Sequence, residues 1–495
     1  MKLADLLPAL PQCSVEGGLD REVHALRYDS RRVEPGDVFF AWKGAAVDGH
    51  RFIHDACQRG AAAVVLESAD HEIATASFVR VPDARRALAL MAGAYYGYPA
   101  RSLSLVGVTG TNGKTTTAFA VQHLLRLLHP GVPVGMLGTV RYDLGDRVLP
   151  ASRTTPEGAD LQELLAEMRQ AGCRAAAMEV SSHALDQGRV EGIDFNAAIF
   201  TNLTPDHLDY HQTMEAYFKA KQKLYGRLTP GRGAAVVNLD DPYGRRLISI
   251  LPASEAIIGF SASGNGTAYL RAENVRAGVV GTEFDLVYGD RRQAVRTPLI
   301  GRFNVANALG ALGAVLALGL PFERCEEGLA GLPAVPGRME RFGGGEGEPA
   351  VVVDYAHTED AMRKALRTLR DLSPRRLALV IGCGGNRDRT KRPKMAAAAL
   401  ELADRVYFTA DNPRNETVAG IFADMREGVV AGQAAQWIED RREAIALAIA
   451  EAEPGDIVCV AGKGHEATQE VFGVYTPFDD REIVAGLLAD RRRSS

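Results

Sequence analysis

The chain has 495 residues, of which 46% are hydrophobic and 24% are charged, and its formal net charge is −5. This composition is typical of an ordinary globular protein, and the length predicts about three domains. A net negative charge provides no overall basic field of the kind that nucleic-acid-binding proteins use, so that function class is excluded.

Three further features of the whole chain bear on its cellular compartment and on membrane insertion. The six cysteines are scattered without close pairs, which is not the pattern of a disulfide framework or a zinc site, so we expect a reducing cytoplasm. Asp5 and Pro8 interrupt the N-terminal apolar run, which makes it a poor signal peptide. The longest uncharged stretch, 303–322, contains Asn304, Asn307 and glycines, and this favours a buried helix over a membrane span.

The first hundred residues alternate short apolar runs with turn signals. We expect strands in "GDVFFAWKG", "AAAVVLES" and "SFVRVPD", then a helix in "ARRALALMAGAYYG". The residues "YPA" at 98–100 are typical of a linker. This part of the chain is therefore predicted to form a separate α/β domain.

Two further sets of buried strands follow. The first comprises "LSLVGV", "CRAAAMEVSS", "FNAAIFTNL" and "GAAVVNLDD", alternating with helical patterns, which predicts a parallel sheet covered by helices on both faces. The prolines and glycine of "LPAVPGRMERF" indicate a second boundary. Beyond it, "AVVVDYAH", "LALVIGCGG", "RVYFTADN" and "DIVCVAGKG" each end in a polar loop, and we expect a ligand site at those carboxyl ends.

The strongest local motif is "VGVTGTNGKTTTA" at 106–118. A strand leads into a glycine-rich turn and then an apolar helix, so that backbone N–H groups and the helix N-terminus can surround phosphates. Lys114 would reach the terminal phosphates and the Thr115 hydroxyl would hold Mg²⁺. Val108 stands where the strict Walker A pattern has glycine, so the match is imperfect. We expect ATP to bind at Gly110, Thr111, Asn112, Gly113, Lys114, Thr115 and Thr116.

Two polar residues follow neighbouring strands of the same predicted sheet. Glu179 ends the apolar run "AAAMEV", and His207 lies in the loop after "AAIFTN". Both are expected beside the phosphate-binding turn, because carboxyl ends of parallel strands meet at one edge of a sheet. Taken separately, a surface carboxylate and a hydrogen-bonded loop histidine remain the alternatives.

The segment "DNPRNE" at 411–416 follows a predicted strand of the last domain. Asp411, Asn412 and Pro413 are ordinary turn formers. Arg414 is different, because a guanidinium just after a proline has limited freedom and can bind a carboxylate through two parallel hydrogen bonds. A surface arginine in a turn is the alternative.

Several motifs together carry a resemblance over nearly the whole chain. In the order "TGTNGKTT", "MEVSSHALDQGRV", "TNLTPDHLDYH", "GRFNVANALGA", "VVVDYAHT" and "AGKGHE", the sequence resembles the Mur ligases, the ATP-dependent amide-forming enzymes of peptidoglycan precursor synthesis. The turn "DNPR" is similar to that of the members which add meso-diaminopimelate to UDP-N-acetylmuramoyl-L-alanyl-D-glutamate. The resemblance implies an α/β protein with an N-terminal UDP-binding domain, a central P-loop ATPase domain with a mainly parallel sheet, and a C-terminal Rossmann-like domain, placed at 1–99, 100–333 and 334–495.

The resemblance also implies a reaction through an acyl phosphate with ATP and Mg²⁺. The residues implied in catalysis are Lys114, Glu179, His207 and Lys221, and those implied in holding Mg²⁺ are Thr115, Glu179, His207 and Lys221. In the family a lysine in the position of Lys221 is carbamylated (N6-carboxylysine), which turns a cation into a carboxylate. The segment 214–228 contains three lysines, Lys219, Lys221 and Lys223, which by pattern alone form a solvated helix face.

Further nucleotide and acceptor contacts are implied in the same way. For ATP they are Asn304, Arg338, Asp354 and His357, with a helix-capping asparagine and a structural histidine as the alternatives for the first and last. For the UDP-linked acceptor they are Tyr28, Ser30, Thr154, Thr155, Ser181, Gln187 and Arg189. Ser30 starts a turn, and the two threonines are N-cap candidates before a proline, which are the simpler interpretations.

The amino-acid pocket implied by the resemblance consists of Arg387, Asp411, Asn412, Pro413, Arg414, Gly462 and Glu466. Arg414 would pair with the carboxylate that distinguishes meso-diaminopimelate from L-lysine, and Glu466 would bind an ammonium. One residue departs from many relatives, which have aspartate where Asn386 stands. This affects the orientation of Arg387 and not the expected substrate.

Three rival functions share this fold. A folylpolyglutamate-type enzyme lacks the predicted uridine-binding first domain, and a lysine-adding ligase lacks the arginine at position 414. A non-catalytic nucleotide-binding scaffold has no need of an intact Lys114, Glu179 and Lys221. We expect a cytoplasmic monomer with no nucleic-acid partner and no membrane insertion.

Overall fold

A computed structural model describes residues 1–44, 47–67, 75–253, 256–345, 347–430 and 435–494. The chain forms two compact units. The first consists of Met1–Ser261, Asn265–Arg271 and Ala306–Cys325, and the second of Ala262–Gly264, Ala272–Val305 and Glu326–Ser495. Mixed α/β structure fills both, which confirms the predicted fold class. The three domain ranges expected from the sequence remain a prediction.

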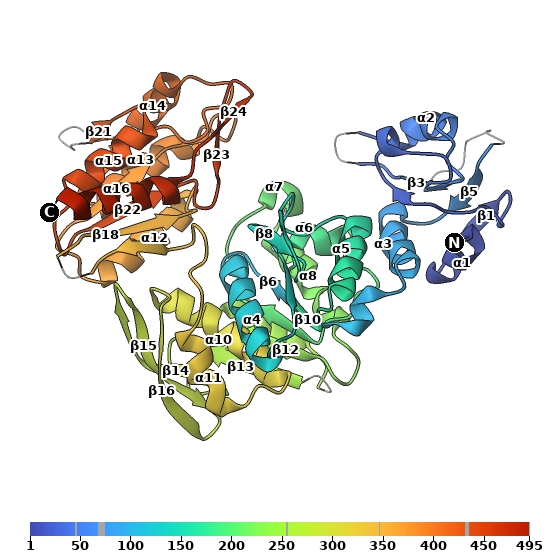
Figure 1. The fold of residues 1–495 in the computed structure, drawn as a ribbon, viewed down its shortest axis with the longest axis horizontal. Helices are drawn as coiled ribbons and strands as arrows, with labels where there is room; N and C mark the ends of the chain where they lie inside the picture. The colour runs from blue at the N-terminus through green and yellow to red at the C-terminus, as the bar shows by residue number, and fades with distance from the viewer. Residues whose placement is uncertain (45–46, 68–74, 254–255, 346, 431–434, 495) are drawn as a thin grey trace. The chain divides into compact units, whose positions relative to one another are not determined.

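The first unit begins with a small sheet. Its strands, in spatial order, are β1 (Ser14–Glu16), β5 (Ser77–Arg80), β4 (Ala63–Leu66), β3 (Val38–Ala41) and β2 (Leu26–Arg27), and only β1 runs antiparallel to its neighbour. Helix α3 (Ala84–Tyr95) starts where the Asp83 side chain accepts the backbone N–H of Arg86. It packs against α5 (Gly158–Gln170), as Figure 1 shows. The three strands and the helix expected in this region are confirmed.

A larger parallel sheet forms the centre of the first unit. Its parallel strands, in spatial order, are β13 (Ala256–Ser261), β12 (Ala234–Asn238), β11 (Ala197–Phe200), β6 (Ser104–Thr109), β10 (Ala175–Glu179) and β7 (Val134–Leu137). Strands β8 (Arg141–Asp143) and β9 (Val148–Pro150) extend one edge in antiparallel fashion, and the first residues of β14 (Leu270–Gly278) pair with β13 at the other. Buried apolar residues on both faces of β6, β10 and β11 explain the parallel arrangement.

Helices connect these strands and carry several of the predicted site residues. They are α4 (Lys114–Leu128), α6 (Ser182–Asp186), α7 (Leu208–His211), α8 (Met214–Gln222) and α9 (Pro242–Ile250). Helix α10 (Arg302–Ala317) runs from the second unit into the first, and its residues are largely buried, as expected for the uncharged stretch. None of the helices in the described ranges is both long and apolar enough to cross a bilayer.

The second unit contains an antiparallel pair, β15 (Gly281–Tyr288) and β16 (Arg291–Thr297), and a six-stranded sheet. The sheet order is β17 (Glu340–Gly343), β18 (Ala350–Asp354), β22 (Ile457–Ala461), β19 (Leu377–Ile381), β20 (Arg405–Phe408) and β21 (Gln436–Trp437), and all but β17 run parallel. Four of these strands are the ones expected from the sequence. A separate hairpin, β23 (Thr468–Val471) and β24 (Val474–Pro477), follows β22.

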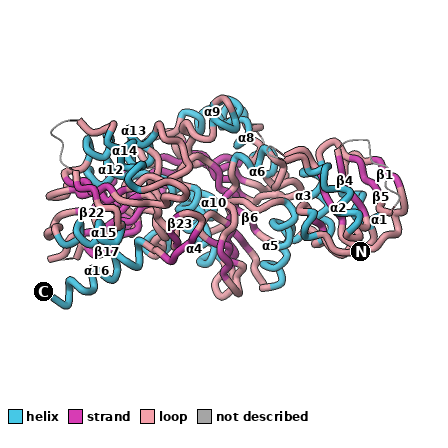
Figure 2. Tube along the Cα trace, turned by 90° about the horizontal axis from the view of Figure 1, so that it is seen from above, coloured by secondary structure: helices cyan, strands magenta, loops and turns pink. Residues whose placement is uncertain are grey.

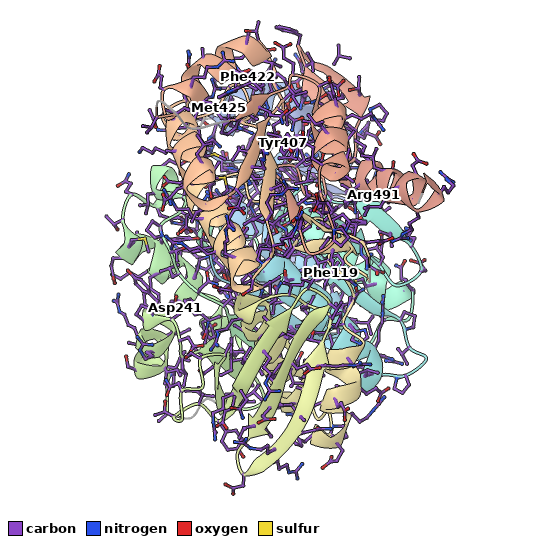
Figure 3. The ribbon with its side chains drawn as sticks, turned by 90° about the vertical axis from the view of Figure 1, so that its left-hand side faces the viewer. Phe119, Asp241, Tyr407, Phe422, Met425 and Arg491 are labelled. Atoms are coloured by element: carbon purple, nitrogen blue, oxygen red, sulfur yellow. The ribbon has the colours of Figure 1, made fainter. Side chains whose placement is uncertain are left out.

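Helices cover both faces of the six-stranded sheet. On one face lie α12 (Glu359–Asp371), α13 (Lys391–Leu402) and α14 (Val418–Arg426), and on the other α15 (Arg441–Ala450) and α16 (Asp480–Ser494), as Figure 2 shows. Figure 3 labels one side chain from the strands, Tyr407, and two from α14, Phe422 and Met425. Tyr407 packs in the core beneath α15 and α16, whereas Phe422 and Met425 pack in the opposite core. The sheet is therefore buried on both faces, as a Rossmann-like arrangement requires.

Candidate functional site

The glycine-rich turn lies between β6 and α4, as the motif predicts. Gly110 has φ +150° and Gly113 has φ +85°, backbone conformations that favour glycine. A Cβ atom on Gly110 would lie 1.9 Å from the Thr201 hydroxyl, and one on Gly113 would lie 2.2 Å from the Asn307 amide oxygen. Lys114, the first residue of α4, donates from Nζ to the carbonyl oxygens of Gly110 (3.0 Å) and Thr111 (2.9 Å). The turn is thus tightly packed and presents a helix N-terminus suited to phosphates.

Glu179 ends β10 beside this turn, because its register partner is Val108 of β6. Its carboxylate is buried and accepts three hydrogen bonds, from the Thr115 hydroxyl (3.1 Å), the Thr139 backbone (2.8 Å) and the Thr139 hydroxyl (3.1 Å). The structure therefore brings together Thr115 and Glu179, two of the four residues expected to hold a metal ion. Thr139 was not predicted, because it lies outside the motifs found in the sequence.

Lys221 on α8 is the only one of its three neighbouring lysines whose side chain is buried. It is 1% exposed, and its Nζ donates to the Gly110 carbonyl at 2.7 Å. Lys219 and Lys223 are 69% and 50% exposed in their side chains. Burial, together with the nearby Lys114 ammonium, holds the pKa of Lys221 well below its ordinary value. The simple expectation of a solvated face is therefore wrong for Lys221 and correct for the other two.

His207 precedes α7 in a left-handed conformation, φ +52°, in the loop that follows β11. The centre of its ring lies 6.2 Å from the centre of the Tyr217 ring, and Nζ of Lys221 lies 4.7 Å from the centre of the same Tyr217 ring. Burial lowers the pKa of His207, with Lys114 and Lys221 acting in the same direction. The imidazole is thus held neutral and keeps a lone pair for a ligand.

The donor set around the turn fits Mg²⁺. A carboxylate and a hydroxyl 3.1 Å apart, at Glu179 and Thr115, are hard oxygen donors of the kind that Mg²⁺ prefers together with phosphate oxygens and water. Within the described residues there is no group of three or more His, Cys, Asp or Glu side chains arranged for a metal. Lys221 fits the same set only as a carbamate, because an ammonium carries no lone pair.

Four of the residues predicted to bind the UDP-linked acceptor substrate lie together at the carboxyl end of β10. The Thr155 hydroxyl donates to the Glu179 carbonyl (2.8 Å) and accepts from the Ser181 backbone (3.1 Å). Arg189 donates to the Thr155 carbonyl (2.8 Å) and to the Gln187 amide oxygen (2.6 Å). The cluster offers hydroxyls, an amide and a guanidinium to an oxygen-rich anionic ligand.

Thr154 connects this cluster to the glutamate at the turn. Its hydroxyl lies 3.1 Å from that of Thr139, which in turn donates to Glu179. The residues predicted to bind the UDP-linked substrate and those predicted to hold Mg²⁺ thus belong to one hydrogen-bonded network.

Sequence reasoning missed a carboxylate surrounded by three arginines in the same region. Glu157, which is buried, accepts from Arg85 (2.7 Å) and Arg153 (2.6 Å), and Arg189 lies 3.2 Å away. Arg85 comes from α3, so this cluster links the small sheet's helix to the central part of the first unit. Three guanidiniums around one carboxylate leave a net positive charge beside the residues predicted to bind the UDP-linked acceptor.

Tyr28 and Ser30 lie in the N-terminal part of the first unit. The Tyr28 hydroxyl donates to Asp160 at 2.6 Å, and burial raises the pKa of this tyrosine. Ser30 is buried at the start of a short 3-10 helix whose cap is Asp29. The structure places these two residues in contact with α5 and with a turn respectively, and their role toward uridine remains a prediction.

The turn at 411–416 follows β20 in the second unit, at the carboxyl end of the sheet. Arg414 has φ +54° and is partly buried, with 22% of its side chain exposed. Its Nη1 donates to the Gly385 carbonyl (2.8 Å), and its Nε lies 3.3 Å from the Glu470 carboxylate. Arg414 is therefore not a freely moving surface side chain.

Asn412 is hydrogen-bonded to several groups near the residues predicted to bind the amino acid. Its amide nitrogen donates to Glu466 (2.8 Å), and its amide oxygen accepts from the buried Lys463 (3.2 Å) and from the Glu470 backbone (3.0 Å). Asp411 is buried beside Gly462, where an added Cβ would lie 2.6 Å from the aspartate oxygen.

The remaining members of the predicted pocket lie next to these groups. Pro413 is buried, and its backbone lies against Gly385. Arg387 is exposed near Gly384. The seven residues expected for the amino acid thus come from three loops at one edge of the sheet.

The four other residues predicted for the nucleotide also lie in the second unit. Asn304 is buried on α10 and donates to the Ile300 carbonyl (3.0 Å). Asp354 ends β18 and accepts from the backbones of Met339 and Ala356, while burial raises its pKa. The Arg338 guanidinium lies 4.4 Å from the centre of the Tyr355 ring.

His357 follows Asp354 closely, and its Nδ1 lies 2.9 Å from the Tyr355 carbonyl. Burial lowers its pKa. Arg338, Asp354 and His357 are thus grouped around Tyr355 and the end of β18, whereas Asn304 stands on a separate helix.

Comparison with known proteins adds to this geometry. The models described as "Mur ligase family, catalytic domain", "Mur ligase middle domain" and "Mur ligase, glutamate ligase domain" match residues 22–96, 108–315 and 337–464. Two similar relatives are both named UDP-N-acetylmuramoyl-L-alanyl-D-glutamate–2,6-diaminopimelate ligase. The one from Geobacillus thermodenitrificans is 44% identical over 99% of this chain and 100% of its own length, and the one from Streptomyces coelicolor is 44% identical over 97% and 95%.

A solved structure of a protein with the same name is also similar. It has a TM-score of 0.73 and 35% sequence identity, and the match covers 99% of this chain and 100% of that one. The chain is therefore similar to these proteins along its full length and not only at the motifs.

Proposed function

Because this chain belongs to the Mur ligase family, we propose that it joins meso-2,6-diaminopimelate to the D-glutamate of UDP-N-acetylmuramoyl-L-alanyl-D-glutamate with consumption of ATP. It is a ligase that forms a carbon–nitrogen bond in peptidoglycan precursor synthesis. The observation that carries the choice of amino acid is Arg414, which is held at the carboxyl end of the sheet by Gly385 and Glu470. A guanidinium in that place pairs with a carboxylate and not with the ammonium of L-lysine.

The reaction consists of two displacements. The D-glutamate carboxylate attacks the γ-phosphorus of ATP, so that an oxygen–phosphorus bond forms and ADP leaves. The amine of diaminopimelate then attacks the acyl carbon, phosphate leaves and the nitrogen loses a proton. Both steps gain most from the positioning of the reactants and from the neutralisation of their charges.

The chain supplies these effects at the turn between β6 and α4. The backbone N–H groups of the turn and the N-terminus of α4 bind phosphate oxygens, and Lys114 exchanges its carbonyl partners for the terminal phosphates. When bound, Mg²⁺ would neutralise phosphate charge, held by Thr115 and Glu179 with His207 and the carbamate of Lys221. Arg189 and the hydroxyls of Thr155 and Ser181 orient the acceptor beside this turn.

The setting and assembly are part of the same proposal. We place the reaction in the cytoplasm, because ATP and a UDP-linked substrate are required, and we expect the enzyme to act as a monomer. The rival assignments are ligation of L-lysine by the same chemistry and a non-catalytic nucleotide-binding scaffold. The burial of Lys221 against the Gly110 carbonyl speaks against the scaffold, because an unused buried amine only destabilises a protein.

Incubation of the protein with ATP, Mg²⁺ and UDP-N-acetylmuramoyl-L-alanyl-D-glutamate tests the proposal, with meso-diaminopimelate or L-lysine offered in parallel. Product mass and phosphate release are read together. Ligation of diaminopimelate alone is the expected result. Equal or better use of lysine would assign the chain to the lysine-adding enzymes, and a folded protein that ligates neither would be a scaffold.

A further inference from the structure

Thr139 lies in the turn between β7 and β8, and the position of this hairpin is fixed by two further hydrogen bonds. The Gly138 N–H donates to the Arg141 carbonyl (3.2 Å), which closes the turn. The Asp143 carboxylate of β8 accepts from the Gln122 amide of α4 (2.8 Å). Since α4 begins at the glycine-rich turn, the hairpin is attached to the helix that would receive the phosphates.

Thr139 donates to both oxygens of the buried Glu179 carboxylate. Its backbone N–H donates to Oε1 (2.8 Å), and its hydroxyl donates to Oε2 (3.1 Å). The Thr115 hydroxyl donates to Oε2 as well (3.1 Å). An ionised carboxylate has about four lone-pair sites, so these three bonds within the described part of the chain leave about one site, on Oε1, for a cation.

The direction of the hydrogen bonds extends this arrangement to Thr154. Because an ionised carboxylate has no proton to give, the Thr139 hydroxyl must use its single proton toward Glu179. Its oxygen then accepts from the Thr154 hydroxyl, 3.1 Å away. One side chain thus holds a carboxylate suited to the cation and a residue predicted to bind the UDP-linked acceptor.

Resting on the proposed function, we propose that Thr139 is a positioning residue for both sites. It fixes the orientation in which the Glu179 carboxylate holds Mg²⁺, and it holds Thr154 for the acceptor. Thr139 acts through these two residues and not by contact with a reactant. Loss of a group that hydrogen-bonds to a metal ligand typically lowers metal affinity by about 10- to 100-fold, which makes the role measurable.

Gly138 belongs to the same arrangement and provides an independent variant. A Cβ atom on Gly138 would lie 2.4 Å from Oε1 of Glu179. The atom that must yield is the end of a flexible side chain, so Gly138→Ala should displace the carboxylate while the fold is kept.

Calorimetry of ADP binding tests the proposal without any need for ligation. Each protein is titrated once with excess Mg²⁺ and once with a chelator, and the ratio of the two affinities gives the contribution of the cation. Thr139→Val removes the hydroxyl at nearly constant volume, and Thr139→Ser retains it. Circular dichroism verifies the folding of each variant.

Two matched controls lie elsewhere in the first unit. Thr229→Val also removes a threonine hydroxyl, which donates to the Phe195 carbonyl (3.1 Å) before the start of β11. Gly226→Ala adds a Cβ that has no atom within 4 Å. Both controls should bind ADP as the wild type does, with and without Mg²⁺.

Thr139→Val is expected to reduce the gain in affinity from Mg²⁺ about tenfold or more and to leave the metal-free affinity unchanged. Gly138→Ala should show the same loss, and Thr139→Ser should restore the gain. In the ligation assay Thr139→Val should raise KM for the UDP-linked acceptor but not for diaminopimelate, because Thr154 belongs to the acceptor site alone.

Two results would overturn the role of Thr139. One is an unchanged gain from Mg²⁺ in Thr139→Val. The other is an equal loss of affinity with and without Mg²⁺, which would show that Thr139 merely supports the turn. A wild-type protein that ligates nothing would refute the proposed function, whereas the calorimetric comparison would still decide whether Thr139 positions Glu179 for the cation.

Discussion

Nζ of Lys221 lies 2.7 Å from the carbonyl oxygen of Gly110, so that a buried lysine on α8 reaches the turn between β6 and α4. Burial and the neighbouring Lys114 both lower the pKa of Lys221, which means that its amine loses a proton at lower pH than an ordinary lysine. Only the neutral amine reacts with CO₂, forming a nitrogen–carbon bond and releasing a proton. The environment of Lys221 therefore favours carbamylation.

We predict that Lys221 takes up CO₂ reversibly and that the carbamate is needed for ligation. Carbon-13 NMR of protein equilibrated with labelled bicarbonate should show one carbamate signal that disappears in Lys221→Arg. The same variant should lose about a hundredfold or more in kcat, on the scale of other lost electrostatic contacts. Lys219→Arg is the control, and since its side chain is 69% exposed the signal and the activity should both remain. Full activity without CO₂ would contradict this role.

Arg414→Ala should remove selectivity for the distal carboxylate. We expect kcat/KM for meso-diaminopimelate to fall by about 10³-fold or more, because a site that binds a polar group discriminates strongly against its loss. Phosphate release with each amino acid measures the effect. Arg442→Ala changes an exposed arginine of the same unit and should leave the kinetics unaltered. A small effect of Arg414→Ala would mean that this arginine belongs to the turn alone.

Gly113→Ala should abolish ATP use. The substitution adds strain at φ +85° and places Cβ 2.2 Å from the Asn307 amide oxygen, so the turn must move. Gly131→Ala is a matched control, since its φ is +75° but no atom lies within 4 Å of the added Cβ. Each variant should lose about 1 kcal/mol of stability from backbone strain. Only Gly113→Ala should lose nucleotide binding, measured by calorimetry.

Arg392 should determine the shape of the proposed amino-acid pocket. Its guanidinium is 0% exposed and donates to Glu416 (2.8 Å), Asp424 (2.7 Å) and the Gly384 carbonyl (3.1 Å). Arg392→Met should cost about 3 kcal/mol of stability, because two carboxylates lose their buried partner, and should raise KM for the amino acid but not for ATP. Arg389→Ala, which removes an exposed partner of Asp424, should cost about 1 kcal/mol or less.

The same network predicts an acid dependence. The Arg392 guanidinium lowers the pKa of Glu416 from 4.5 to about 2. Its contribution to stability is therefore present above about pH 4.5 and is lost as the pH falls toward 2, since the unfolded chain binds the proton first. In Arg392→Met this part of the acid sensitivity should disappear.

His465 should make the second unit sensitive to mild acid. Burial, reinforced by Arg338, lowers the pKa of His465 to about 4, so the folded protein keeps the ring neutral. Between pH 6.5 and about 4 the unfolded chain binds more protons, and stability must fall as the pH falls. Chemical denaturation of His465→Gln at neutral and mildly acidic pH should show a loss about 1 kcal/mol smaller than in wild type. His54→Gln, an exposed histidine, should behave as wild type.

Local sequence patterns are sufficient to predict the main strands and turns of this protein and the residue types at its motifs. Apolar runs such as 175–179 and 457–461 are strands, and the turn at 110–113 has the backbone that its glycines allow. These features depend on neighbouring residues, so spacing and residue type are sufficient to predict them. The resemblance, which rests on such local motifs, indicated the family.

The contacts between side chains that are distant in the sequence depend on the tertiary fold. Lys221, rather than Lys219 or Lys223, is buried because the packing of α8 turns one face inward, and a helix with three lysines does not reveal that face. Glu470 reaches Arg414 through a hairpin more than fifty residues further along the chain.

Arg392 and Glu157 are two further charged residues whose burial and pairing depend on the tertiary fold. Each is a charged residue that no motif singled out. Arg392 gains Glu416 and Asp424, and Glu157 gains Arg85 and Arg189, only when separate loops or helices come together. Charged side chains of this kind are normally solvated, so nothing in their local sequence predicts that folding will bury and pair them.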